Sequence, residues 1–282
     1  MKIGLVLEGG AMRGLYSAGV IDTFLEENIS IDKIIGVSAG ALFGMNYKSK
    51  QAGRVLRYNT KYLTNKNYMG LYSYLTTGNV MNEDFCFHQL VHELDPVDFK
   101  TYRESPVEFY VVVTNLQTGR GEYHRLDDLD HQDNIEYLRA SGSMPYVSKP
   151  VIINNQKYLD GGCSDSIPIR KMMDMDVDKI IVVLTRPLGF RKKEGPHVIN
   201  ELYYKKYPHF IDTLNHRYLD YNLSLDIISS LEKKKEIFVF RPSRYIKVGR
   251  IEKNVKVIQE MYRLGYDDAH QQLDALKEYL NQ

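Results

Sequence analysis

The first fifty residues constrain the fold more than any other part of the chain. An apolar run at residues 3–7 leads into a glycine-rich stretch at residues 8–14, and a helical pattern of apolar residues extends from about residue 15 to 27. A second apolar run at residues 31–37 leads into a second helical pattern at residues 39–50. This alternation of strand and helix is typical of a parallel sheet covered by helices. The sequence therefore predicts an α/β fold.

The rest of the chain adds strands and helices around a poorly periodic region. Residues 61–81 are rich in Tyr, Asn, Thr and Gly, and they predict a long loop or a lid with short helices. Within residues 149–159, Asn154 and Asn155 predict the turn of a hairpin, because asparagine tolerates a positive φ. Periodicity predicts further strands at residues 107–114, 179–185 and 237–240, and further helices at 134–141, 197–235 and 255–280.

The composition changes after Pro187. Residues 191–196 are charged and interrupted by Gly and Pro, and the chain beyond them is mostly helical in pattern. We therefore expect a main domain at residues 1–190 and a small α-rich C-terminal extension at residues 191–282 that packs on it.

Charge and cysteine content exclude several classes of function. Lys plus Arg (37) nearly balances Asp plus Glu (36), which argues against a strongly basic nucleic-acid binder. The two cysteines, Cys86 and Cys163, are too few for a disulfide framework or a Cys-based zinc site, so we expect reduced, buried thiols.

The run at residues 3–7 is too short for a signal peptide or a membrane span, and no uncharged apolar stretch of about 18 residues follows. We therefore predict a soluble, cytoplasmic protein.

The second strand-to-helix junction carries a candidate nucleophile. Gly36-Val37-Ser38-Ala39-Gly40 fits the pattern G-x-S-x-G. Such a turn holds its serine at a strained backbone angle, and small flanking residues avoid the clashes that follow. The pattern alone also fits a glycine-rich turn without catalytic function. The predicted strand before it and helix after it favour a nucleophile.

The glycine-rich turn after the first strand predicts an anion site. Its N–H groups at a helix N-terminus suit either a nucleotide phosphate or the oxyanion of acyl transfer. Ala11 breaks the dinucleotide pattern, and no P-loop Gly-Lys-Ser/Thr follows. We therefore interpret the turn as an oxyanion hole. Arg13 fits two roles, one pairing with a phosphate or carboxylate of a ligand and one bracing the loop.

A serine nucleophile needs a base, and an aspartate fits that role better than any histidine. Asp160-Gly161-Gly162 follows a predicted strand end, where the carboxylate can point towards Ser38. Burial beside a serine would raise the pKa of this aspartate above its ordinary value. By itself, Asp-Gly-Gly also fits an ordinary turn. None of the histidines occurs at a strand end next to a small-residue turn: His88, His92, His124, His131, His197, His209, His216 and His270. The last four, which follow Asp160 as a triad histidine would, lie in helical or charged surroundings and are expected at the surface.

The motifs in this order resemble the patatin-like phospholipase family. That family has Asp-Gly-Gly-Gly-x-Arg/Lys-Gly, then G-x-S-x-G, then Asp-Gly-Gly/Ala, which match residues 8–14, 36–40 and 160–162. Residues 140–145 (Ala-Ser-Gly-Ser-Met-Pro) are similar to the family's Ala-Ser-x-Ala-x-Pro segment. The similarity extends over roughly residues 3–185, and the ordered set is far more specific than any single motif.

The resemblance implies a three-layer α/β/α fold and a serine hydrolase that cleaves acyl esters of lipids without a metal or another cofactor. It implies Ser38 as nucleophile and Asp160 as proton acceptor. It also implies an oxyanion hole from the backbone of Gly9, Gly10 and Ala11. Residues of the same turns support these groups: Arg13, Gly14, Gly36, Gly40, Gly161 and Gly162.

Two departures and several alternatives accompany the resemblance. Glu8 replaces the family's aspartate and Ala11 its third glycine, so a positive φ at Ala11 would be strained. An acyltransferase would use the same acyl-enzyme, and a lipid-binding protein would keep only the scaffold. Residues 68–72 fit either an apolar lid that transiently touches a membrane surface or a packed loop. Head group, acyl length and oligomeric state are not encoded in any recognisable pattern.

Overall fold

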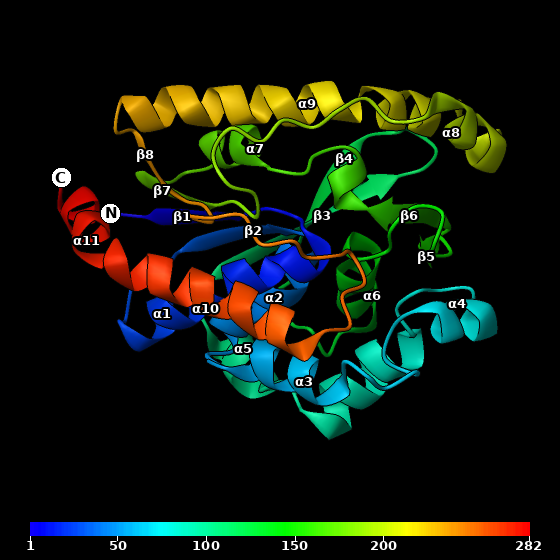
Figure 1. Cartoon of the computed structure of the whole chain (residues 1–282), viewed down its shortest axis with the longest axis horizontal. Helices are drawn as coiled ribbons and strands as arrows, with labels where there is room; N and C mark the ends of the chain where they lie inside the picture. The colour runs from blue at the N-terminus through cyan, green and yellow to red at the C-terminus, as the bar shows by residue number, and fades with distance from the viewer.

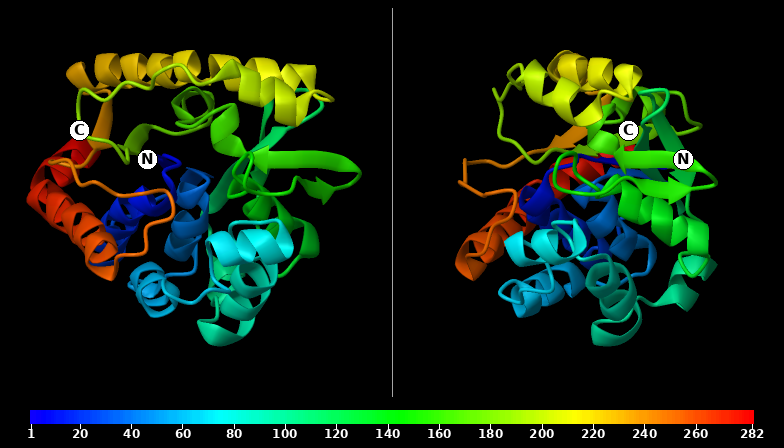
Figure 2. Two further views of the ribbon diagram at one scale, coloured as in Figure 1. Left: turned by 45° about the vertical axis from the view of Figure 1, so that its right-hand side comes forward. Right: turned by 90° about the vertical axis from the view of Figure 1, so that its right-hand side faces the viewer.

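A single mixed sheet runs through the molecule, with helices on both of its faces (Figures 1 and 2). The computed structural model describes the backbone of residues 1–282 and every side chain except that of Gln132. The strand order is β5-β6-β3-β2-β1-β7-β8, with β4 paired to β3. The strands are β1 (Ile3–Leu7), β2 (Lys33–Val37), β3 (Glu108–Asn115), β4 (Gly121–Arg125), β5 (Val151–Ile153), β6 (Gln156–Asp160), β7 (Lys179–Val183) and β8 (Ile237–Phe240).

Strands β3, β2, β1, β7 and β8 are parallel, whereas β4, β5 and β6 pair in antiparallel fashion. The prediction of an α/β fold with a mainly parallel sheet is therefore confirmed. The helices are α1 (Leu15–Glu26), α2 (Ala39–Lys48), α3 (Arg54–Tyr62), α4 (Leu71–Thr77), α5 (Phe99–Glu104), α6 (Gln132–Ser141), α7 (Ile169–Met173), α8 (His197–Tyr204), α9 (Pro208–Lys233), α10 (Val255–Gln271) and α11 (Leu273–Asn281), with short segments η1 (Ala11–Gly14), η2 (Phe85–Leu94) and η3 (Gly161–Cys163).

The two faces of the sheet bury alternate residues of each strand. Leu5 and Leu7 of β1 pack under α1 and α2, whereas Val6 points to the opposite face, which α7 and α9 cover (Figure 1). Every residue of β1 is buried, as expected for a strand with helices on both sides. This three-layer arrangement directs the carboxyl ends of β1 and β2 to one edge of the sheet, where the candidate motifs follow.

The hairpin and the irregular region agree with the sequence prediction. Asn154 and Asn155, between β5 and β6, have φ values of 48° and 61°. Between residues 61 and 81 the chain forms the end of α3, the short helix α4 and an isolated bridge between Met69 and Met81. The helical pattern at residues 255–280 is divided into α10 and α11 at Gln272.

The C-terminal part contributes to both layers and to the sheet. Strand β8 extends the sheet beside β7, α9 lies across one face and α10 lies against α1 on the other (Figure 2). The helical character expected after residue 190 is confirmed. The division into domains at that residue remains a prediction, although β8 shares the sheet of the first part. Within the described chain, none of the helices has the length and apolarity that a membrane span needs.

Candidate active site

Ser38 occupies a sharp turn between β2 and α2. Its φ of 53° and ψ of −121° are strained for a residue with a side chain, which is the geometry expected of a nucleophile elbow. Gly40 makes the turn possible, because a Cβ there would lie only 2.9 Å from the carbonyl oxygen of Glu8. Gly9 lies against the same turn, where a Cβ would come within 3.2 Å of the Ser38 Cβ. The two glycine motifs therefore meet at Ser38.

Asp160 lies at the end of β6 and contacts the candidate nucleophile directly. The Ser38 hydroxyl donates a hydrogen bond to Asp160 Oδ2 at 2.6 Å, and the Gly162 N–H donates to Asp160 Oδ1 at 2.7 Å. Both side chains are buried, with exposed fractions of 8% for Ser38 and 5% for Asp160. Burial raises the pKa of the Asp160 carboxyl, while the bond from Ser38 and the charge of Arg217 oppose that rise. The pair joins residues 122 positions apart in the sequence.

The glycine-rich turn presents backbone N–H groups beside Ser38. The Gly9 N–H donates to the Ser166 carbonyl at 3.3 Å, so it is already engaged within the protein. The N–H groups of Gly10 and Ala11 have no acceptor among the described residues. Ala11 has a φ of 48°, so the strain that its side chain implied in the sequence is present. Of the three expected donors, Gly9 is therefore the only one engaged within the described part of the protein.

Glu8 anchors this turn through contacts that sequence reasoning did not find. Its carboxylate is buried and accepts hydrogen bonds from the Thr185 N–H at 2.5 Å and from the Tyr221 hydroxyl at 2.7 Å. Tyr221 belongs to α9, so the C-terminal part helps to fix the turn. No local pattern in the sequence marks Tyr221, because it is separated from Glu8 by 213 positions.

The segment at residues 140–145 supports both members of the pair. The Ser38 N–H donates to the Ser141 hydroxyl at 2.9 Å, and the Asp160 N–H donates to the Ser143 carbonyl at 2.8 Å. The resemblance to a family motif pointed to this segment but not to these contacts. Gly14 ends η1, Gly36 lies in β2 directly before the turn at Ser38, and Gly161 begins η3 directly after Asp160.

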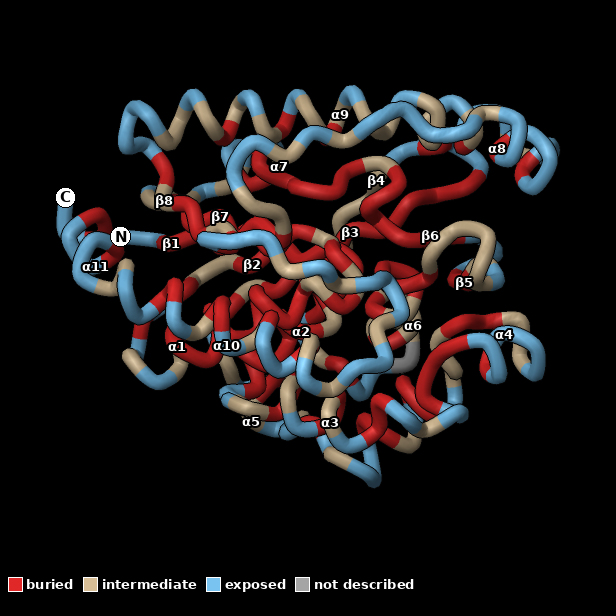
Figure 3. Tube along the Cα trace, viewed as in Figure 1, coloured by how far each residue is buried: buried red, intermediate tan, exposed pale blue. Residues whose placement is uncertain are grey.

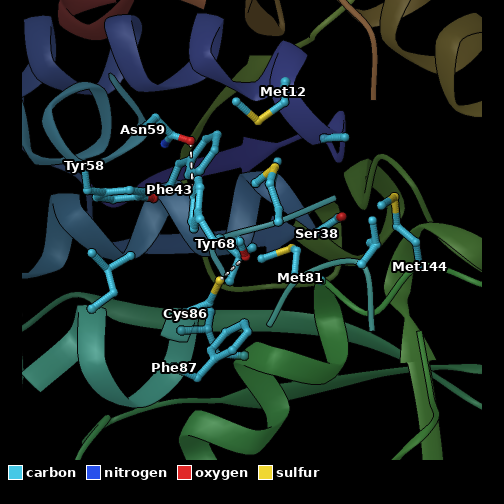
Figure 4. Close-up of a pocket in the computed structure, with 18 of the residues that line it drawn as sticks. Met12, Ser38, Phe43, Tyr58, Asn59, Tyr68, Met81, Cys86, Phe87 and Met144 are labelled. Carbon is cyan, nitrogen blue, oxygen red and sulfur yellow. Dashed lines mark hydrogen bonds between the residues drawn. The ribbon is translucent and has the colours of Figure 1, made fainter. Parts of the chain in front are cut away.

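An apolar cavity extends from Ser38 between α2, α3 and η2 (Figure 4). Ser38 and Met144 lie at one end of it, and Tyr58 and Asn59 lie at the other. Its volume is about 80 Å³, so it is small. Five of the ten methionines of the chain line it: Met12, Met45, Met69, Met81 and Met144.

The cavity also divides the tyrosine-rich segment into two parts. Tyr68 and Met69 are buried and line the cavity, whereas Leu71 and Tyr72 on α4 are exposed (Figure 3). The sequence left open whether residues 68–72 form an apolar lid or a packed loop. In the structure the first two residues are packed and the next two are exposed.

Arg13 is half-buried, and its Nε has no hydrogen-bond partner among the described atoms. The ion pairs among the described side chains do not include Arg13. None of the side chains recorded around the cavity is a histidine. Among the described side chains, no three His, Cys, Asp or Glu residues gather where they could hold a metal ion.

Comparison with known proteins identifies the class to which this fold and site belong. Residues 5–173 match the family model of the patatin-like phospholipases, so the chain belongs to that family. Residues 207–281 match a second model, described as a domain of unknown function (DUF6363).

Similar proteins include both bacterial and fungal members. The uncharacterized protein YjjU of Escherichia coli is 24% identical over 94% of this chain and 75% of its own length. Lysophospholipase nte1 of Aspergillus niger is 30% identical over 64% of this chain, but the match spans only 12% of that much longer protein. The crystal structure of VipD from Legionella pneumophila has a TM-score of 0.49 at 14% identity, covering 97% of this chain and 67% of VipD.

Proposed function

We propose that this protein hydrolyses acyl esters of lipids through a dyad of Ser38 and Asp160. The observation that carries this proposal is the 2.6 Å hydrogen bond between the Ser38 hydroxyl and the Asp160 carboxylate at the end of an apolar cavity. Membership of the patatin-like phospholipase family supports a lipid ester as substrate, as does the similarity to a fungal lysophospholipase.

The first half of the reaction acylates Ser38. Asp160 accepts the hydroxyl proton as Ser38 Oγ attacks the ester carbonyl carbon, and the N–H groups of Gly10 and Ala11 bind the resulting oxyanion. The C–O bond to the leaving alcohol then breaks, and the alcohol takes the proton back from Asp160. The partial positive charge at the start of α2 favours the negative intermediate.

The second half returns the free enzyme. A water molecule gives its proton to Asp160 and attacks the acyl carbon, and the acid leaves as Ser38 Oγ regains a proton. The cavity is small, but its methionines adapt their shape to apolar ligands, so we expect it to widen around a flexible alkyl chain. Burial raises the pKa of Asp160, which makes it a stronger base than a solvated carboxylate.

Exposed apolar side chains on two helices support a contact between the protein and a lipid surface. Leu71 and Leu75 on α4 are exposed to 72% and 73%, and Val198 and Leu202 on α8 to 76% and 74%. Both helices lie on the same side of the molecule in Figure 1. We therefore propose a transient contact of this side with a lipid surface, without a spanning segment.

The test is intact-mass spectrometry after treatment with an alkyl fluorophosphonate. We expect one adduct on the parent and none on Ser38→Ala. Asp160→Asn should label about 10²–10⁴ times more slowly, the usual contribution of a general base. Ser230→Ala, an exposed serine on α9, is the matched control and should label like the parent. A folded parent that forms no adduct, or an adduct that survives Ser38→Ala, would refute the dyad.

A further inference from the structure

The connection between β8 and α10, which we call the C-terminal strap (residues 241–254), supplies part of the wall of the cavity beside Ser38. Arg250 and Ile251 of the strap line the cavity, whereas the other recorded lining residues lie between residues 11 and 144. In Figure 1 the orange strap crosses in front of the sheet towards α6 before it turns back to α10. The strap lies within the match to the domain of unknown function and outside the match to the phospholipase model. The C-terminal part therefore completes a cavity that the phospholipase domain otherwise builds.

The end of the strap is a turn that its own Glu252 holds together. The Glu252 carboxylate accepts hydrogen bonds from the N–H groups of Gly249, Lys253 and Asn254 at 3.2, 3.0 and 2.9 Å. These bonds are all local, so they are kept when the turn moves as a unit. We call residues 249–254 the tip of the strap.

Lys253 fastens the tip to the tyrosine-rich segment. Its Nζ donates hydrogen bonds to the carbonyl oxygens of Leu63 at 2.9 Å and of Met69 at 2.6 Å. Its stem lies against Gly70, where a Cβ would be 3.4 Å from Lys253 Cε. Met69 itself lines the cavity, so the ammonium group joins two parts of the cavity wall that come from distant parts of the sequence.

The remainder of the strap has few bonds to the body of the protein. Within the described chain, none of the main-chain hydrogen bonds recorded outside helices and strands begins or ends in residues 241–253. Near its start, the N–H and the hydroxyl of Ser243 donate to the Asp268 carboxylate of α10 at 2.9 and 2.6 Å. Ile246 and Val248 pack against the main core. A segment with so few main-chain bonds opens at a lower free-energy cost than a helix or a strand.

A long acyl chain requires one wall of the cavity to move, because the volume of the cavity is only about 80 Å³. The walls from α2, α3 and η2 belong to the main core, and close-packed cores resist displacement. Ile251 belongs instead to the tip of the strap and has an exposed fraction of 38%. The tip is therefore the part of the wall that moves most easily, and its movement requires release of the two hydrogen bonds from Lys253.

We propose that Ile251 and Lys253 are specificity-determining residues, with Ile251 closing the cavity at the strap and Lys253 holding that wall in place. Long acyl chains take up a productive position at Ser38 only after the tip has moved away, whereas short acyl groups react without this movement. The proposal rests on the proposed function, because it assigns control of acyl-chain length to the same site. It also gives the domain of unknown function a role in the selection of the substrate.

The test compares a short and a long probe that carry the same reactive group. Ser38 is labelled with monomeric fluorophosphonates that bear an ethyl or a dodecyl chain, and intact-mass spectrometry gives the rate constant of each reaction. Lys253→Met keeps an unbranched side chain but loses both hydrogen bonds. The dodecyl probe should therefore react about tenfold or more faster, the usual effect of losing a charged hydrogen bond, while the ethyl probe reacts at the parent rate. Lys253→Arg keeps hydrogen-bond donors and should react like the parent with both probes.

Two further variants keep the test decisive. Lys247→Met removes an exposed charge from the same strap, so it is the matched control and should react like the parent with both probes. Ile251→Ala shortens the wall itself and should accelerate the dodecyl probe severalfold, with no change for the ethyl probe. Equal acceleration of both probes in Lys253→Met would show an effect on Ser38 itself and would overturn the proposal. Unchanged rates in folded Lys253→Met and Ile251→Ala would overturn it as well.

A failure of the dyad is distinguishable from a failure of the chain-length control. Binding of the fluorescent fatty acid cis-parinaric acid to Ser38→Ala protein, followed by stopped flow, reports entry into the cavity without any reaction. Adding Lys253→Met to that protein should accelerate this binding, as it accelerates dodecyl labelling. Absence of labelling in the parent together with accelerated binding would refute hydrolysis alone. Normal labelling together with unchanged rates of binding and of dodecyl labelling would refute the chain-length control alone.

Discussion

Helices α1 and α10 cross at a pair of glycines, and adding one methyl group there should destabilise the protein. Gly265 of α10 lies against the backbone of α1, and a Cβ on it would be 2.8 Å from the carbonyl carbon of Tyr16 and 2.9 Å from its Cα. Gly19 of α1 faces α10 in the same way, with a Cβ position 2.6 Å from the Tyr266 nitrogen. Since the obstacles are backbone atoms, no change of rotamer relieves the overlap in Gly265→Ala.

The expected magnitude follows from two opposing effects. Overpacking a tight contact costs about 1–3 kcal/mol of stability. We expect a cost of about 3 kcal/mol here, because the backbone atoms of the other helix cannot move aside. Alanine in place of glycine in a helix returns about 1 kcal/mol. The free energy of unfolding should therefore fall by about 2 kcal/mol, which corresponds to a decrease of roughly 3–4 °C in Tm for a chain of this size.

Urea denaturation followed by circular dichroism measures this change. Gly195→Ala is the control, because nothing lies within 4 Å of a Cβ at that position, and its stability should match or slightly exceed that of the parent. The double variant Gly19→Ala/Gly265→Ala should lose less than the sum of the single losses, since one separation of the helices relieves both overlaps. Equal stability of Gly265→Ala and the parent would refute the close crossing.

Three further predictions concern the site. The acid limb of kcat/KM against pH should report Asp160, because this residue acts as a base only when it is deprotonated. The midpoint of that limb should lie above the ordinary carboxyl pKa of 3.8, since burial raises the pKa of Asp160. Arg217→Met should move the midpoint to still higher pH, because the charge of Arg217 stabilises the Asp160 carboxylate. A midpoint that moves to lower pH in that variant would contradict this. Ala11→Gly should raise the free energy of unfolding by about 1 kcal/mol in urea, because relief of the positive φ exceeds the added chain entropy of glycine; a loss of stability would show that Ala11 is unstrained. Tyr221→Phe should lower the free energy of unfolding by about 1.5–3 kcal/mol, because the buried Glu8 carboxylate loses a hydrogen-bond donor. A variant with the same thermal denaturation curve as the parent would show that the hydrogen bond from Tyr221 to Glu8 does not stabilise the protein.

Local patterns in the sequence were sufficient for the core of the fold and for the placement of the three motifs. The turn at Ser38 could be predicted because its strand, its small neighbours and its helix are contiguous, and the hairpin because two asparagines mark it. The meeting of Ser38 with Asp160 was expected only through the resemblance to a family, because contiguous patterns give no distance between residues so far apart.

Contacts between distant segments were beyond prediction for a physical reason. Tyr221 and Arg217 lie on one surface of α9, and their neighbours in sequence resemble those of any amphipathic helix, so nothing local distinguishes them. The engagement of the Gly9 N–H by Ser166 depends on a backbone carbonyl, which leaves no trace in residue identity. Strand β8 could be predicted as a strand but not as the edge of the sheet, since its partner is set by tertiary packing.

The methionines around the cavity have a consequence for the redox sensitivity of the protein. Oxidation of a thioether to its sulfoxide turns an adaptable apolar wall into a polar, bulkier one. Half of the chain's methionines line this one cavity, so a peroxide small enough to enter it would oxidise thioether groups near Ser38. Oxidative stress would then reduce acyl-chain binding without altering the dyad, and enzymatic reduction of the sulfoxides would restore it.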